Sequence, residues 1–171
     1  ALSSAASDVY KRQAYATAYS RLLLLLKGGK IGKVVSIDAT CSSIIDTDKI
    51  EKINSLKDWG PTALLPIFQI LGTNYKSKKI ITKLLDKQNR NDAFTKIDFI
   101  YDDAVASIKV AERAKSEGNL IITGTNGYVY VPAPWWKTDY FEIRFENQTE
   151  NKRYFYQLDG EGIRYELVTF I

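Results

Sequence analysis

Short runs of alternating apolar and polar residues fill the second half of the chain. A period of two residues is typical of strands with one buried face. Two turns between these runs predict hairpins, Asp102-Asp103 and Asn126-Gly127, the second with the positive φ angles of a tight turn. Sequential strands are therefore expected to pair antiparallel. The predicted strands cover residues 79–85, 94–101, 104–111, 120–124, 128–131, 140–147 and 153–158.

The first half of the chain contains two segments with helical character. Residues 15–27 predict a helix that ends at Gly28-Gly29, because glycine commonly follows the last helical turn. Residues 62–71 are apolar on nearly every side and predict a buried helix that ends at Gly72. Pro66 lies inside this second helix and has no N–H to donate. A kink, or a carbonyl without its helical partner, is expected there.

A strand and a polar connection separate the two helices. Residues 31–43 alternate as a half-buried strand, and residues 46–53 can form a short helix within the connection. The segment 58–61 is interpreted as a turn that leads into the second helix, with Pro61 at its first position. Helices followed by strands predict an α+β fold, an open, largely antiparallel β-sheet with helices packed on one face.

The open face of this sheet is expected to mix charged and aromatic side chains. In the strand at residues 140–147, Glu142 and Arg144 alternate with Phe141 and Ile143. Such a face can meet water, but it can equally meet a second copy of itself. The expected partner is therefore another copy of this chain, in a homo-oligomer formed through the open face.

Composition excludes several classes of function. The 171 residues carry a net charge of +4, from 24 basic and 20 acidic residues mixed along the chain, so neither a nucleic-acid partner nor a membrane surface is indicated. The apolar run 22–26 is far shorter than a membrane span. Cys41 is the only cysteine, which favours a reducing compartment, and we expect a cytoplasmic location. The chain has no histidine, and no metal site is expected.

Residues 1–13 are interpreted as a leader that does not belong to the natural protein. Residues 3–13, SSAASDVYKRQ, can be translated from the adapter that transposon-based sequencing libraries attach to DNA ends. A disordered native N-terminus is the alternative. With the adapter interpretation the natural protein begins upstream, and the domain proper covers residues 14–171. The segment 161–171 resembles a helix start without a stop, so the C-terminus is also expected to be truncated.

Two tryptophans and a lysine form the densest cluster of candidate binding residues. Trp135, Trp136 and Lys137 follow a strand that ends in two prolines, which places them at an edge or end of the sheet. Indole rings there can stack on a sugar or a nucleotide, and Lys137 can hold a polar group of the same ligand. The alternative, which composition favours, is that the tryptophans cover the end of the core or an interface.

A second cluster lies where the second helix is expected to begin. Asp58, Trp59 and Thr62 would surround the free N–H groups of a helix start, which attract an anion or a polar oxygen. Asp58 could act there as an acid or a base. The alternative is a plain helix cap with Trp59 packed over it.

Several motifs together resemble one known family. They are Tyr15 with Arg21-Leu22, the run KGGKIGK at 27–33, the run ITGTNGYVYV at 122–131, and LDGEGIRYEL at 158–167. In this order they resemble the C-terminal domain of the Gfo/Idh/MocA oxidoreductases, over nearly everything after Gln13.

The resemblance implies a two-domain enzyme. An N-terminal Rossmann domain would bind NAD or NADP, while this chain would contact a sugar, polyol or nucleotide-linked sugar and supply the oligomerisation sheet. The glycine fingerprint of a Rossmann domain is absent from the sequence, so no cofactor-binding residue is assigned and the chain alone is expected to be inactive. The family's aspartate and histidine positions align with Pro66 and Ile70, which transfer no proton, and the catalytic residue is not assigned. A non-enzymatic, self-associating or carbohydrate-binding domain is the alternative.

Overall fold

The computed structural model of the chain describes residues 17–44, 54–84 and 92–156. The leader at 1–13, the short helix expected at 46–53 and the segment 161–171 lie outside these ranges. In chain order the elements are α2 (Thr17–Lys27), β1 (Val34–Ser42), α3 (Ser55–Leu71), β2 (Ser77–Lys83), β3 (Phe94–Ile100), β4 (Val105–Ala111), β5 (Leu120–Gly124), β6 (Tyr128–Val131), the 3₁₀ turn η2 (Trp135–Lys137), β7 (Tyr140–Arg144), the 3₁₀ turn η3 (Gln148–Glu150) and β8 (Lys152–Phe155).

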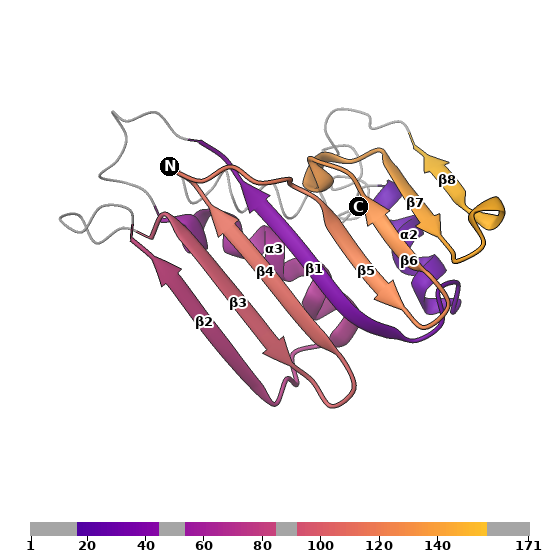
Figure 1. The fold of residues 1–171 in the computed structure, drawn as a ribbon, viewed down its shortest axis with the longest axis horizontal. Coiled ribbons are helices and arrows are strands. Elements are labelled where there is room, and N and C mark those ends of the chain that lie inside the picture. The colour runs from indigo at the N-terminus through magenta and orange to yellow at the C-terminus, as the bar shows by residue number, and fades with distance from the viewer. Residues whose placement is uncertain (1–16, 45–53, 85–91, 157–171) are drawn as a thin grey trace, which may run out of the picture.

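The strands form one eight-stranded sheet in the order β2-β3-β4-β1-β5-β6-β7-β8. Both helices lie behind the sheet in the view of Figure 1, and the face toward the viewer carries none of the described helices. This arrangement confirms the predicted α+β fold with helices on one face. The expectation that all sequential strands pair is wrong at one place, because β1 lies between β4 and β5, parallel to the first and antiparallel to the second.

Both predicted hairpins are present. Asp102-Asp103 joins β3 to β4, and Asn126-Gly127 joins β5 to β6. The expected positive φ is absent at Gly127, so that detail is wrong. Glycine fits there for another reason, since a Cβ at this position would lie 2.7 Å from the carbonyl oxygen of Arg144. At the ends of α2 and α3, Gly29 and Gly72 do have positive φ, as a helix stop favours.

The helix α3 begins earlier than the sequence indicated. It starts at Ser55, so the segment 58–61 is helical and the predicted turn is wrong. Asn54 caps the helix by accepting a hydrogen bond of 2.9 Å from the N–H of Lys57. The helix continues through Pro61, which lies on its exposed side, where water can bond the carbonyl that the proline leaves unpaired.

The core lies between the sheet and the two helices. Ile37, Ala39 and Cys41 point into it from β1, as the alternation predicted, while Asp38 between them is exposed. Burial raises the pKa of the Cys41 thiol, so this side chain is a packed thiol without a nucleophilic role. Within the described parts of the chain, no helix has the length and apolar character that crossing a bilayer requires.

Candidate functional site

The two clusters predicted from the sequence meet at the beginning of α3. The indole rings of Trp59, in the first turns of α3, and Trp136, in η2, have centroids 4.9 Å apart and are tilted by 57°. Both side chains are partly exposed. The Trp59 indole N–H donates to the hydroxyl of Ser43, just after β1, at 3.3 Å. We call Trp59 and Trp136 the tryptophan pair.

Trp135 belongs to the core and not to this exposed pair. Its side chain is 1% exposed, and its indole N–H donates to the carbonyl oxygen of Thr40 at 3.0 Å. The ring contacts Trp136 edge-on, with centroids 6.3 Å apart. The alternative in which a tryptophan covers the core therefore applies to Trp135, which supports Trp136 from below and presents no surface to a ligand.

Trp136 is also held by the backbone of the segment before β5. Its ring packs on Gly118, where a Cβ would lie 2.9 Å from the indole carbons. The N–H of Trp135 donates to the carbonyl of the same glycine at 3.0 Å. Lys137 follows as the last residue of η2 and is exposed. Trp136 and Lys137, both predicted from the sequence, therefore lie at the same edge of the fold as Trp59.

Three carboxyl groups surround the beginning of α3. Asp58 lies in its first turns and shares a side-chain hydrogen bond with Glu112, the residue after β4. Glu112 also accepts the N–H of Asn54 at 3.2 Å. Asp92, before β3, accepts the N–H of Leu56 at 3.1 Å. Beside the local cap Asn54, two acidic groups from other parts of the chain, Glu112 and Asp92, accept N–H groups at the helix N-terminus, which the helix dipole favours.

Glu112 keeps its proton to a higher pH than an ordinary carboxyl group, because its pKa is raised. Two carboxyl groups bond to each other only when one is protonated, since two carboxylates repel. Burial raises the pKa of Glu112 to about 7, with the neighbouring charges of Asp58 and Asp92 as further causes, while the N–H of Asn54 opposes the shift. A carboxyl pair of this kind can donate or accept a proton or a hydrogen bond beside the tryptophan pair.

Thr62 lies deeper in the fold than the sequence suggested. The helix start expected near this residue is wrong, because α3 begins at Ser55. The side chain is 1% exposed, and its hydroxyl has no hydrogen-bond partner among the described residues. Pro66 has no N–H, so the carbonyl oxygen of Thr62 has no helical donor either. A ligand cannot reach this buried hydroxyl from the surface.

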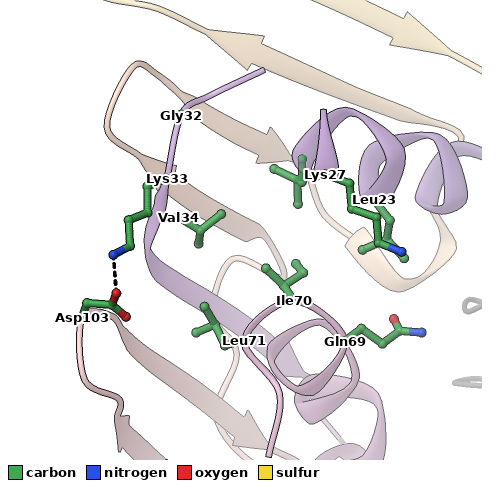
Figure 2. A pocket seen from close by; sticks show the side chains of 10 residues that line it. Leu23, Lys27, Gly32, Lys33, Val34, Gln69, Ile70, Leu71 and Asp103 are labelled. Carbon is green, nitrogen blue, oxygen red and sulfur yellow. Dashed lines mark hydrogen bonds and ion pairs between the residues drawn. The ribbon is translucent and has the colours of Figure 1, made fainter. Parts of the chain in front are cut away.

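A separate hollow lies at the other end of α3. It has a volume of about 350 Å³ and is lined from α2, the start of β1 and the last turn of α3. Ile70 lines it from the last turn of α3 (Figure 2). No group of three or more acidic, cysteine or histidine side chains suited to a metal ion occurs among the residues that the structure describes.

The sequence predicted one side of this candidate site, and the other was not predicted from it. Asp58, Trp59 and Trp136 were identified, but Glu112 and Asp92 were not. A sequence signal for Glu112 does exist. Ile108 and Val110 are alternate, buried residues of β4, and Glu112 is the next in this series, so it places a carboxyl group at a core position. No local pattern marks Asp92.

No family model matches the sequence, and no curated protein matches it. Solved structures do match. An oxidoreductase from Agrobacterium radiobacter, in complex with NAD⁺, L-tartaric acid and magnesium, has a TM-score of 0.71 at 16% identity, covering 94% of this chain and 51% of that one. For an NAD-binding oxidoreductase from Klebsiella pneumoniae the TM-score is 0.74 at 13% identity, and the match covers 93% of this chain and 54% of that one. For KijD10, a 3-ketoreductase from Actinomadura kijaniata in complex with NADP and TDP-benzene, the TM-score is 0.77 at 10% identity. This match covers 94% of this chain and 51% of that one.

The chain therefore spans about half the length of the solved structures that it matches. Its fold matches that of about half of each of these oxidoreductases. At these identities the likeness is one of fold, so the residues of the site are argued from the geometry of this chain alone.

Proposed function

We propose that this chain is the C-terminal domain of an NAD(P)-dependent oxidoreductase of the Gfo/Idh/MocA type. In this proposal a Rossmann domain encoded upstream binds NAD or NADP, and the present chain supplies contacts to a sugar, polyol or nucleotide-linked sugar. The observation that carries the proposal is the match of 93–94% of this chain to about half of several oxidoreductases.

No residue of this chain is assigned to a nicotinamide site. A dinucleotide site needs a glycine-rich turn between a strand and a helix N-terminus, and the sequence that follows β1, residues 43–54, contains no glycine. The cofactor would supply the hydride from the other domain. Among the residues that the structure describes, Asp58 and Glu112 form a carboxyl pair that can hold a proton at the beginning of α3, where Trp59 also lies.

The substrate class is supported by the chemistry of the site. An exposed indole offers an apolar face to the C–H groups of a sugar ring, while carboxyl groups bond its hydroxyls. Trp59 and Asp58 are adjacent in α3 and present both features. The ligands of two matched oxidoreductases, L-tartaric acid and TDP-benzene, are a polyhydroxy acid and a nucleotide analogue, which suit the same class.

The proposed oligomer uses the open face of the sheet. Ile100 and Val105 are opposite each other on β3 and β4, and they are 43% and 47% exposed. Farther across the face, the guanidinium of Arg144 lies 4.6 Å above the ring of Tyr130. We expect sedimentation velocity to give a mass of two or more chains. A species of 19.4 kDa that persists at high concentration would count against the oligomer.

The genomic DNA upstream of the Ala14 codon tests the proposal most directly. It should contain an open reading frame that encodes a βαβ unit with a glycine fingerprint. The purified chain alone should not oxidise NADH with any sugar, because hydride transfer needs both domains around the substrate. Either a native start codon at this position or NADH oxidation by the isolated chain contradicts the proposal.

Sugar binding is expected to quench the fluorescence of the tryptophan pair. Addition of UDP-glucose to the chain should give a saturable change, with UDP alone as the reference for the nucleotide. Trp59→Leu should weaken binding about tenfold, the factor that corresponds to about 1.4 kcal/mol of lost stacking. Tyr130→Leu removes an aromatic side chain from the open face and is the matched control. Equal affinities for the two variants would refute a sugar site at the tryptophan pair.

A further inference from the structure

The hollow at the end of α3 has the size and lining of a small-molecule site. Its volume of about 350 Å³ lies at the lower end of the roughly 300–1,000 Å³ typical of such sites, so its occupant is small. It is lined by the last turns of α2 and α3 and lies at the opposite end of α3 from the tryptophan pair. The sugar site proposed above does not use it.

The walls of this pocket are apolar. Leu23 and Leu26 line it from α2, Val34 from the first position of β1, and Ile70 and Leu71 from the end of α3. None of these side chains carries a hydrogen-bonding group. A ligand therefore gains from burying an apolar body here, at about 25 cal/mol per Å² removed from water.

Two lysines lie at the rim of the pocket, and they differ in whether an acidic side chain pairs with them. Lys33 forms an exposed ion pair with Asp103, so its charge already has an acidic partner. Figure 2 shows this pair on one side of the pocket and Gln69 on the other. Lys27 has no acidic partner among the described residues. The rim therefore has one uncompensated positive charge within the described chain.

The charge of Lys27 is not needed to cap α2. Lysine in a last turn often bonds the free carbonyls of the helix end. Here the carbonyls of Leu24, Leu25 and Leu26 already accept N–H groups from the following residues 28–30, at 2.9–3.1 Å. The ammonium group of Lys27 is thus available to a ligand.

Gln69 offers a second donor at the rim. The hydroxyl of Tyr19, in the first turn of α2, donates to its side-chain oxygen at 2.7 Å. This bond occupies the oxygen and orients the amide, while no described residue accepts from its NH₂ group. A ligand acceptor at this side of the pocket could use the NH₂ group of Gln69 together with Lys27.

We propose that this pocket binds a small monocarboxylate with an apolar body, whose tail packs on Ile70 and Leu71 and whose carboxylate faces Lys27 and Gln69. An amine would be repelled by Lys27. A phosphate would find one cation and one amide where phosphate sites present several converging donors. A free sugar would find no partners for its hydroxyls on the apolar walls. This inference does not depend on the proposed oxidoreductase function, because it concerns binding by this chain alone.

Titration of the ¹⁵N-labelled full chain with sodium octanoate tests the proposal. The amide signals of Gly32, Val34, Ile70 and Leu71 should shift saturably, while those of Trp59 and its neighbours should not. Octanol, which has the same tail without the charge, should bind about two- to fivefold more weakly, the range expected for one exposed ion pair. Octylamine, which has the same tail and a positive charge, should bind more weakly than octanol because Lys27 repels it.

Two variants separate the charge from the apolar wall. Lys27→Gln should weaken octanoate binding about two- to fivefold, whereas Lys30→Gln, a neighbouring lysine outside the lining, should leave the affinity unchanged. Ile70→Trp should fill the pocket and abolish the saturable shifts. If Ile70→Trp does not fold, as judged by its far-UV circular dichroism, the comparison of Lys27→Gln with Lys30→Gln still decides the role of the charge.

Three results would overturn the proposal. They are octanoate shifts that do not saturate, equal octanoate affinities of Lys27→Gln and Lys30→Gln, and saturable shifts centred on residues outside the pocket. Sugar binding by the tryptophan pair is measured separately by fluorescence, so failure of one proposal leaves the other standing.

Discussion

Replacing Trp135 with alanine should lower the free energy of unfolding by about 3–5 kcal/mol, the usual cost of removing a buried tryptophan. Trp135 is 1% exposed and is among the largest fully buried side chains of the described residues. The substitution leaves a cavity between the ends of β1 and β5 and removes the hydrogen bond to the carbonyl of Thr40. Urea denaturation followed by far-UV circular dichroism measures the loss.

Two further variants separate packing from hydrogen bonding at this position. Trp135→Phe keeps most of the ring but leaves the carbonyl of Thr40 without its partner, which costs about 1–3 kcal/mol. Trp136→Ala, at the partly exposed neighbour, is the control and should lose less than Trp135→Ala. A loss at Trp136 that equals or exceeds the loss at Trp135 would contradict the assignment of Trp135 to the core.

Glu112→Gln should make the folded chain more stable at pH 8 and leave its stability nearly unchanged at pH 4. Burial and Asp58 raise the pKa of Glu112 from 4.5 to about 7 in the folded state. A raised carboxyl pKa contributes stability that is complete below about pH 4.5 and is lost as the pH rises through about 7. Glutamine remains neutral and keeps an acceptor for the N–H of Asn54. The difference at pH 8 should be about 2–3 kcal/mol.

The test is the free energy of unfolding of both proteins from pH 4 to pH 8, measured with urea at constant ionic strength. Glu117→Gln changes an exposed glutamate of the following loop and serves as the control, so its profile should follow that of the unchanged chain. Parallel profiles for Glu112→Gln and the unchanged chain would show that the Asp58–Glu112 pair holds no extra proton.

The sequence predicted the members of the candidate site better than their arrangement. Asp58 and Trp59 were recognised from a helix-start pattern, and Trp136 from a strand that ends in proline. The same patterns placed the helix start too late. Gly60-Pro61 is typical of a turn, but α3 begins earlier because Asn54 caps it and Asp92 and Glu112 accept its free N–H groups.

The strands were predicted well where the pairing is local. Hairpins at Asp102-Asp103 and Asn126-Gly127 join neighbours in the sequence, and β3, β4, β5 and β6 lie where the alternation placed them. The ends of β2, β7 and β8 differ by a few residues. β2 and β8 are the two edge strands, where only one neighbour defines the strand end, and β7 lies next to β8.

The sequence alone determined the helix ends at glycine, the hairpin turns, the buried faces of β1, β3 and β7, and the α+β class. These features depend on φ preferences and on side-chain periodicity over a few residues, so a short segment of sequence is enough to predict them. Only the tertiary structure decided that β1 lies between β4 and β5, that Trp59 meets Trp136, and that Glu112 bonds Asp58. Those contacts join residues far apart in the chain, and they form because packing the two helices on one face of the sheet buries the most apolar surface there.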